Sequence, residues 1–266
     1  MPSIMHDAKH MTPAEARSLC RSGAWAAPTA GLCDGYAQAN LVIVPERWAD
    51  DFSNFCARNE QACPLLERTE PGEVEAGISA PGSDLRYDLP RYKVLIDGEV
   101  DRTVTSIEAF WRDDFVSFLL GCSFTFEHHL MDAGIPVRHI ACGRNVPMFR
   151  TNRACESSGV FSGPLVVSMR PMLPKEAERA SRITASMTEA HGGPVHIGDP
   201  RELGIADPHK PDYGEPVPFL PGEVCVFWAC GVTPLEALRG AKLPVAVTHA
   251  PGHMFLTDRR ETIDDT

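Results

Sequence analysis

A thiol, a hydroxyl and a carboxylate lie close together in the segment GCSFTFE, residues 121–127. A carboxyl group among aromatic residues can have a raised pKa and act as a general acid or base, so we expect Glu127 to move protons. Ser123 would offer a hydroxyl to an oxyanion. Cys122 is a further catalytic candidate, or else a buried structural cysteine. The segment is not a nucleophile elbow, because Thr125 stands where G-x-S-x-G requires glycine.

Two arginines have the chemistry to bind a carboxylate substrate. Arg170 follows the apolar run PLVVSM and precedes a proline, which places its planar guanidinium near the end of a predicted strand. Ser168 lies two residues earlier, so the two side chains point to the same face of that strand. Arg150, in NVPMFRTN, fits a substrate-binding residue and half of a surface ion pair equally well.

The passage VCVFWACGVTPLEALRG predicts a strand, a turn and a helix. Cys230 and Gly231 form the turn, and Thr233 is the expected N-cap, followed by proline and glutamate at the N1 and N3 positions. A helix N-terminus at the end of a strand attracts anions, as in open α/β sheets. We therefore expect Cys230, Gly231 and Thr233 to border a carboxylate site. The alternative is that Thr233 only caps its helix.

The chain has ten histidines. His196 and His249 are candidate proton carriers, and His253 is a candidate substrate ligand. His249 and His253 bracket a Pro-Gly pair, which excludes the helical H-x-x-x-H arrangement of metal ligands. His128 and His129 are adjacent, and adjacent helical side chains are expected to diverge rather than converge. We therefore expect a metal-independent protein with no cofactor, since nucleotide-binding signatures are also absent.

These segments must be positioned by elements that the hydrophobic pattern predicts. Expected helices cover residues 12–21, 46–59, 106–120 and 174–191, and expected strands cover 41–45, 92–96, 100–104, 137–143, 164–170, 194–198 and 224–228. Thr12 and Glu15 predict a capping box at the first helix, and Asp97-Gly98 predicts a hairpin turn between two of the strands. The alternation of strand and helix in the last third favours an open α/β sheet. The predicted fold is α/β. A main mixed α/β layered sandwich, residues 1–135 and 192–266, would carry an inserted two-layer α+β lobe, residues 136–191.

Composition limits the possible functions. The 25 basic and 36 acidic residues give a net charge of −11, which disfavours nucleic acid and anionic membranes as partners. No apolar run is long enough to cross a bilayer, and no secretory signal is recognisable at the N-terminus. The nine cysteines include no C-x-x-C pair, which is typical of reduced thiols. We expect a cytoplasmic protein that binds a small carboxylate or amino acid, with a homodimer as the candidate oligomer.

Several strings in a fixed order make the chain resemble a known family. They are CPLLE, DLPRYKV, GCSFTFE, RHI, NVPMFRTN, SGPLVVSMRP, HGGPVHIGDP, VFWACGVTP and THAPGHMFLTD, which together span nearly the whole sequence. This set is similar to the hydro-lyase, or D-glutamate cyclase, family. The resemblance implies a lyase that removes water from a small amino or hydroxy acid, most specifically by cyclising D-glutamate to 5-oxo-D-proline. Dehydration of another small carboxylic acid and non-catalytic binding of an amino acid or 5-oxoproline are the alternatives.

The cyclisation sets requirements for the candidate residues. The enzyme must anchor the α-carboxylate, remove a proton from the ammonium group and protonate the departing oxygen. Arg170 or the helix end at Thr233 would anchor the carboxylate. Glu127, His196 or His249 would move protons, with donors around Ser123 holding the oxyanion.

Overall fold

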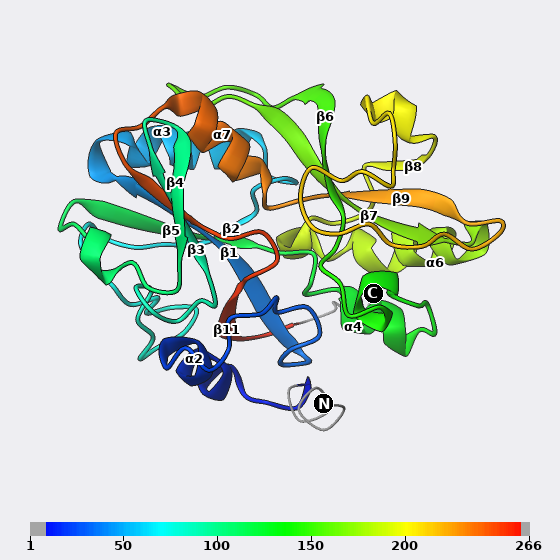
Figure 1. Ribbon diagram of the computed structural model, residues 1–266, viewed down its shortest axis with the longest axis horizontal. Coiled ribbons are helices and arrows are strands. Elements are labelled where there is room, and N and C mark those ends of the chain that lie inside the picture. Colours follow the sequence, from blue (N-terminus) through cyan, green and yellow to red (C-terminus); the bar gives the residue numbers. More distant parts are fainter. Residues whose placement is uncertain (1–8, 262–266) are drawn as a thin grey trace.

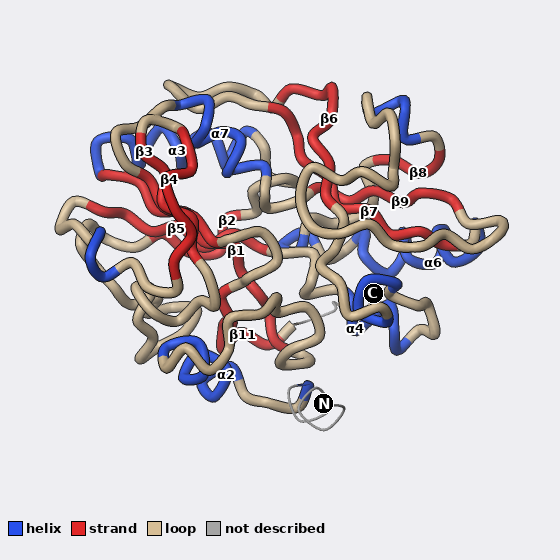
Figure 2. Tube along the Cα trace, in the orientation of Figure 1, coloured by secondary structure: helices blue, strands red, loops and turns tan. Residues whose placement is uncertain are grey.

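The computed structural model describes residues 9–261 and contains two β-sheets with helices packed around them (Figures 1 and 2). The expected α/β class is confirmed. The seven-stranded sheet occupies the left half of Figure 1 and the four-stranded sheet the right half. The first sheet is built from β1 (Tyr36–Pro45), β2 (Leu65–Arg68), β3 (Tyr92–Ile96), β4 (Glu99–Val104), β5 (Phe115–Gly121), β10 (Ala246–His249) and β11 (Phe255–Arg260).

Strand β1 is the centre of the first sheet. Along one edge it pairs with β5, and along the other it pairs with β10 and then with β11. The sheet order is β2-β5-β1-β10-β3-β4, and the expected Asp97-Gly98 turn joins β3 to β4. All of these pairings are antiparallel.

Both faces of the first sheet are buried, which explains the continuous run of apolar residues at 41–45 in β1. Val42 and Val44 face helices α3 (Ala49–Arg58) and α7 (Thr233–Ala241), together with the aromatic side chains of α3. Leu41 and Ile43 alternate onto the opposite face, which residues 76–89 cover. Helix α2 (Pro13–Arg21) packs on β11 and begins with the predicted capping box at Thr12.

The second sheet has the order β6-β7-β9-β8 and is also antiparallel. Its strands are β6 (Met148–Ala154), β7 (Pro164–Met172), β8 (His196–Gly198) and β9 (Val224–Ala229), and the helices beside it are α4 (Glu127–Asp132), α5 (Arg138–Ala141) and α6 (Pro174–Ala185). Three short 3-10 helices, Glu46–Trp48, Glu108–Phe110 and Pro200–Leu203, complete the connections, with a fourth, η3 (Thr188–Ala190), after α6. The second sheet includes β8 and β9, which lie after residue 191. The inserted lobe at residues 136–191 stays a prediction.

Two expected elements are wrong. Residues 115–121 form strand β5 rather than the end of a helix, and every residue of β5 is buried. A seven-residue run without a polar face suits a central strand better than a helix that needs one solvated side. Residues 138–141 form the short helix α5, where a strand was expected. The sequence VRHIACG has no alternation of polar and apolar residues that would distinguish a strand from a short helix.

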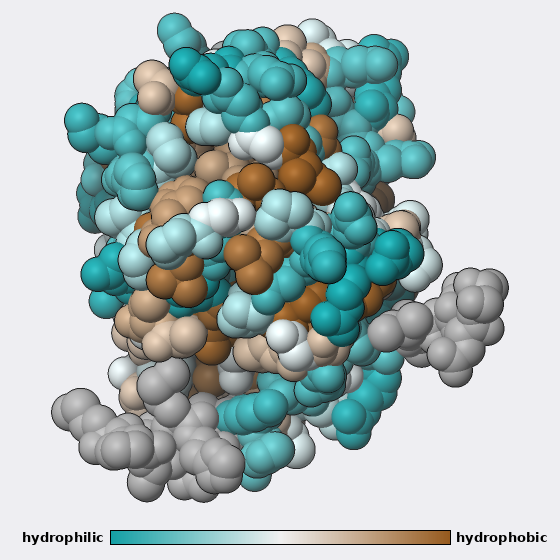
Figure 3. Space-filling view, turned by 90° about the vertical axis from the view of Figure 1, so that its right-hand side faces the viewer, coloured by the Kyte–Doolittle hydropathy of each residue, from teal (hydrophilic) through white to brown (hydrophobic). Residues whose placement is uncertain are grey.

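The described residues contain no helix long and apolar enough to cross a membrane. Figure 3 shows the face of the molecule that carries the second sheet, where hydrophilic residues surround separate hydrophobic patches. In the second half of the chain, the exposed large apolar residues within the described range are Val160, Leu173, Ile197 and Leu220. Isolated apolar residues of this kind are ordinary on a protein surface.

All nine cysteines are unpaired, and seven of them are buried. We predict that thiol titration of freshly purified, denatured and unreduced protein finds nine free thiols per chain. A count below nine in protein handled without oxidant would contradict this arrangement.

Candidate active site at the junction of the two sheets

The loop between β5 and α4 contacts both sheets. On the side of the first sheet, Thr125 Oγ1 accepts a hydrogen bond from the Gln38 backbone N–H at 3.1 Å. Asn40 Nδ2 donates to the carbonyl oxygens of Leu120 and Gly121. On the side of the second sheet, the loop ends at Glu127, which faces β7. The segment GCSFTFE therefore joins the two sheets.

A buried ion pair connects this loop to β7. Arg170 Nε donates to Glu127 Oε1 at 3.0 Å, and Arg170 Nη2 donates to the same oxygen. Nη1 donates to Ser168 Oγ and Nη2 to Ser123 Oγ, each at 3.1 Å. The rings of Phe126 and Trp228 flank the guanidinium at 5.0 and 5.3 Å.

Four sequence-predicted residues therefore meet in one cluster, Ser123, Glu127, Ser168 and Arg170, and all four are buried. Each guanidinium nitrogen of Arg170 already has a partner in the protein. A substrate carboxylate would have to displace Glu127 to reach it. The role of Arg170 as carboxylate anchor stays a prediction, and these four contacts of its guanidinium disfavour it.

His139 completes the cluster and was missed by the sequence reasoning. Its Nε2 lies 3.1 Å from Glu127 Oε1, and its ring stacks against Phe124 with a centroid separation of 6.0 Å. His139 belongs to α5, whose residues were read as a strand, so its position relative to Glu127 could not be inferred. The sequence contained one signal that could have identified His139, the string RHI, which is part of the family resemblance.

The Glu127 carboxylate is held in its ionised form. Burial alone would raise its pKa, but the charges of His139 and Arg170 and their hydrogen bonds outweigh burial and lower the pKa below its usual value. The raised pKa expected from the aromatic surroundings is wrong, because the sequence did not reveal these two cations. An ionised carboxylate paired with a cation is suited to holding the loop in place and unsuited to donating a proton.

The two cysteines of the predicted site are buried beside this cluster. Burial raises the pKa of the Cys230 thiol to about 11 and that of Cys122 further, so both stay protonated at neutral pH. Neither is therefore an activated nucleophile. A Cβ at Gly231 would lie 1.9 Å from Asn40 Nδ2, so glycine is required where this turn meets β1.

Thr233 and Arg150 have structural partners. Thr233 is the first residue of α7 rather than its N-cap, and its Oγ1 accepts from the Val166 backbone N–H at 3.0 Å. The carboxylate site predicted at this helix end stays a prediction, with Val232 rather than Thr233 as the N-cap residue. Arg150 is exposed and forms a two-pronged ion pair with Asp212, with contacts of 2.7 and 3.0 Å. This is the surface ion pair that the sequence left open.

The three candidate histidines bind backbone groups outside the cluster. His196 Nε2 lies 2.9 Å from the Asp199 carbonyl oxygen, and His253 Nδ1 lies 3.0 Å from that of Pro251. His249 is buried on β10, with Nδ1 3.3 Å from the Leu41 carbonyl oxygen. Burial lowers the pKa of His249 to about 4, so its imidazole is neutral near pH 7. None of these contacts brings a histidine to Glu127.

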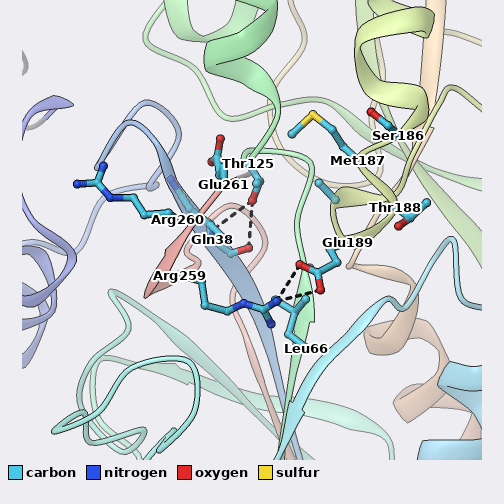
Figure 4. A pocket seen from close by; sticks show the side chains of 13 residues that line it. Gln38, Leu66, Thr125, Ser186, Met187, Thr188, Glu189, Arg259, Arg260 and Glu261 are labelled. Atoms are coloured by element: carbon cyan, nitrogen blue, oxygen red, sulfur yellow. Dashed lines mark hydrogen bonds and ion pairs between the residues drawn. The ribbon is translucent and has the colours of Figure 1, made fainter. Parts of the chain in front are cut away.

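A polar cleft opens on the other side of the same loop (Figure 4). Its volume is about 350 Å³, which is within the range of small-molecule sites. We call it the polar cleft; its principal lining residues are Gln38, Thr125, Ser186, Thr188, Glu189, Arg259 and Glu261. Gly121 lines it where β5 meets η3, and a Cβ there would lie 1.5 Å from the Glu189 carbonyl oxygen.

The charges of the polar cleft come from segments that the sequence reasoning did not select. Arg259 Nη2 donates to both carboxylate oxygens of Glu189 at 2.9 Å. Figure 4 shows this pair spanning the cleft, with Arg260 turned away from it. Arg259 lies near the end of β11, after Thr257 and Asp258. A small cavity of about 10 Å³, lined by Glu127, Gln38 and Glu261 among others, lies between the cleft and the buried cluster.

Comparison with known proteins identifies relatives over nearly the full length of the chain. The D-glutamate cyclase family profile matches residues 116–258. A "Putative hydro-lyase" of Stutzerimonas stutzeri is 54% identical over 95% of this chain and 96% of that protein. Relatives with the same description from Geobacillus kaustophilus (52%; 94% and 95% covered) and Saccharopolyspora erythraea (54%; 95% and 98% covered) are similarly close. A nitrogen repressor-like protein from Methanococcus jannaschii aligns with 12% identity over 86% of this chain and 90% of that one, but its TM-score of 0.34 supports no inference.

We predict that Glu127→Gln and Arg170→Met each lower the free energy of unfolding by about 3–5 kcal/mol, because each leaves an uncompensated buried partner. The double variant should lose less than the sum of the two. Arg150→Met is the matched control and should cost under about 1 kcal/mol, since its pair is exposed. Urea denaturation measures all four variants. Single variants within about 1 kcal/mol of the parent protein would contradict the central role of this pair.

Two buried histidines should make the fold acid-sensitive. Burial lowers the pKa values of His191 and His249 from 6.5 to about 4, so between these pH values the unfolded chain binds more protons than the native one. Stability is therefore full above pH 6.5 and falls as the pH decreases toward 4, by about 2 kcal/mol per histidine at pH 5. Urea denaturation at pH 7.5 and pH 5 should show a smaller difference for His249→Gln than for the exposed control His209→Gln. If the two variants lost the same stability between pH 7.5 and pH 5, His249 would be excluded as a cause of the acid sensitivity.

Proposed function

The chain belongs to the D-glutamate cyclase family, and from this membership we propose that it removes water from D-glutamate, forming 5-oxo-D-proline in the polar cleft. Relatives more than 50% identical are named hydro-lyases, which supports carbon–oxygen lyase chemistry. The finer assignment of substrate and product rests on the family profile and on the charges of the cleft.

The observation that carries the proposal is the pairing of opposite charges across the polar cleft. D-Glutamate has one ammonium and two carboxylate groups, and the cleft presents Arg259 opposite Glu189, with Glu261 nearby. The side chains of Arg259 and Glu189 are 31% and 67% exposed. An exposed pair of this kind contributes about 0–1 kcal/mol, so a substrate can replace it at little cost. The buried Glu127–Arg170 pair offers no such exchange.

Each cleft residue then has a role in the reaction. The substrate α-carboxylate takes the Arg259 guanidinium from Glu189, which frees the Glu189 carboxylate beside the substrate ammonium. Glu189 accepts an ammonium proton, and the amine nitrogen attacks the γ-carboxyl carbon to close the ring. The hydroxyls of Ser186 and Thr188 are positioned on the cleft wall to hydrogen-bond the tetrahedral oxyanion.

The atoms balance without a co-reactant. The nitrogen loses two protons, one γ-carboxylate oxygen gains two, and the C–O bond breaks as water leaves. Glu189 carries the protons from nitrogen to oxygen. In this scheme Glu127, Arg170 and Ser123 are positioning residues, because they hold the loop that carries Thr125 and do not line the cleft.

Incubation of the pure protein with D- and L-glutamate, followed by chiral product analysis, tests the proposed reaction. We expect 5-oxo-D-proline from D-glutamate. An alkenoic acid from a related hydroxy acid, with no ring closure, would replace the proposal with a dehydratase. Tight binding of glutamate or 5-oxoproline without any turnover would make the protein a binding module and overturn the enzymatic assignment.

Two variants separate the roles within the cleft. Glu189→Gln should lower kcat by about a hundredfold, because it removes the proton carrier. Arg259→Lys should mainly raise KM, by the equivalent of about 1.5–3 kcal/mol, because a charged hydrogen-bonding fork is lost. Glu202→Gln, an exposed acid outside the cleft, is the matched control. Folded variants with the parent kinetics would remove Arg259 and Glu189 from the site.

A further inference from the structure

Three metal-binding side chains converge beside the polar cleft. His128 and His129 lie on α4, and Glu261 directly follows β11. His128 Nδ1 is 2.9 Å from Glu261 Oε2, and His129 Nε2 is 3.2 Å from the same oxygen. All three donor atoms lie within 4.8 Å of one another. The Glu261 backbone N–H donates to the Gly35 carbonyl oxygen at 3.2 Å, which fixes the end of the strand.

The adjacent histidines converge because they use different ring nitrogens. His128 presents Nδ1, close to its backbone, while His129 presents Nε2, at the far side of its ring. The two rings overlap, with centroids 3.7 Å apart and an angle of 41° between their planes. The sequence argument that these neighbours must diverge is therefore wrong, because it considered helical direction and ignored which nitrogen is used.

The donor atoms have no partners outside the three side chains. His129 Nε2 and Glu261 Oε2 are buried, and within residues 9–261 their polar contacts are the ion-pair distances of 2.9 and 3.2 Å inside this group. The Glu261 side chain is only 3% exposed. Asp34 and Asp132 add negative charge near His128. Buried polar atoms without hydrogen bonds are uncommon and costly, and a bound cation would satisfy both of these.

We propose that His128, His129 and Glu261 bind one divalent transition-metal ion of the Zn²⁺ class. Tetrahedral coordination with bonds of about 2.0–2.1 Å requires donor atoms roughly 3.3–3.4 Å apart, so the separations of 2.9 and 3.2 Å need only small adjustment. Two imidazoles with one carboxylate favour Zn²⁺, Co²⁺ or Ni²⁺ over Mg²⁺ and Ca²⁺, which prefer oxygen ligands.

Three protein ligands leave coordination positions for water or another ligand. Glu261 lines the polar cleft as well as the small cavity behind it, so an ion here would border the cleft. The metal site does not depend on the proposed cyclisation, because it is argued from the donor atoms alone. A test that measures binding rather than turnover therefore separates the two.

Isothermal titration of chelator-dialysed protein with ZnCl₂ and CoCl₂ tests the site. We expect one ion per chain with a Kd of about 1 µM or tighter, and Co²⁺ absorption bands typical of nitrogen and oxygen ligands. Glu261→Gln and His129→Asn should each weaken binding by at least about tenfold. If one variant does not fold by circular dichroism, the other decides.

Two control variants exclude adventitious binding. His209→Asn removes an exposed histidine, and Cys142→Ser removes the exposed thiol, and neither should change the affinity. Absence of stoichiometric binding, or affinity unchanged in both ligand variants, would show that the three side chains are only an ion pair of a carboxylate with imidazoles. Affinity lost in Cys142→Ser would assign the ion to the surface and likewise overturn the proposal.

Discussion

The buried pair of Glu127 and Arg170 is the interaction on which the rest of this structure depends. Transfer of two charges out of water costs several kcal/mol per ion, and their attraction offsets this only when the remaining polar atoms are also satisfied. Here Ser123, Ser168 and His139 contribute contacts to the same pair. These contacts connect the loop after β5 of the first sheet to β7 of the second.

The polar cleft shows the opposite use of charge. Its walls come from β1, from the end of β11 and from η3. The loop between β5 and α4 also contributes Thr125 to the lining. Arg259 and Glu189 are exposed enough that their mutual attraction is weak and exchangeable. A rigid buried pair next to an exchangeable exposed pair lets one loop support the fold while its outer side stays available to a ligand.

Local sequence patterns were sufficient to predict structural features that depend on a few neighbouring residues. The capping box at Thr12 and the turn at Asp97-Gly98 depend on few residues, and both formed as predicted. The fully buried strand β5 was predicted to be a helix, because a short buried run has no period that distinguishes the two. Ser123, Glu127, Ser168 and Arg170 were selected by residue type and do meet.

The remaining site residues depend on contacts between distant segments. His139, Arg259 and Glu189 acquire their positions only through packing of the two sheets, which no local spacing encodes. The partners of Arg170 likewise decide its role, since a free guanidinium and a committed one have the same sequence signature. The histidine pair on α4 was dismissed by a rule about helical direction that side-chain rotation overrides.

The pairing of β1 has a consequence for how the protein is made. Residue 43 pairs with residue 247 and residue 39 with residue 255, so β1 is synthesised before every other described strand, and two of its partners, β10 and β11, are synthesised after them. Such long-range closure is slow, and until then one edge of β1 is open to other chains. Gln38 and Arg259 lie on the two strands that meet last, so a nascent chain can assemble the Glu127–Arg170 pair before it has a cleft.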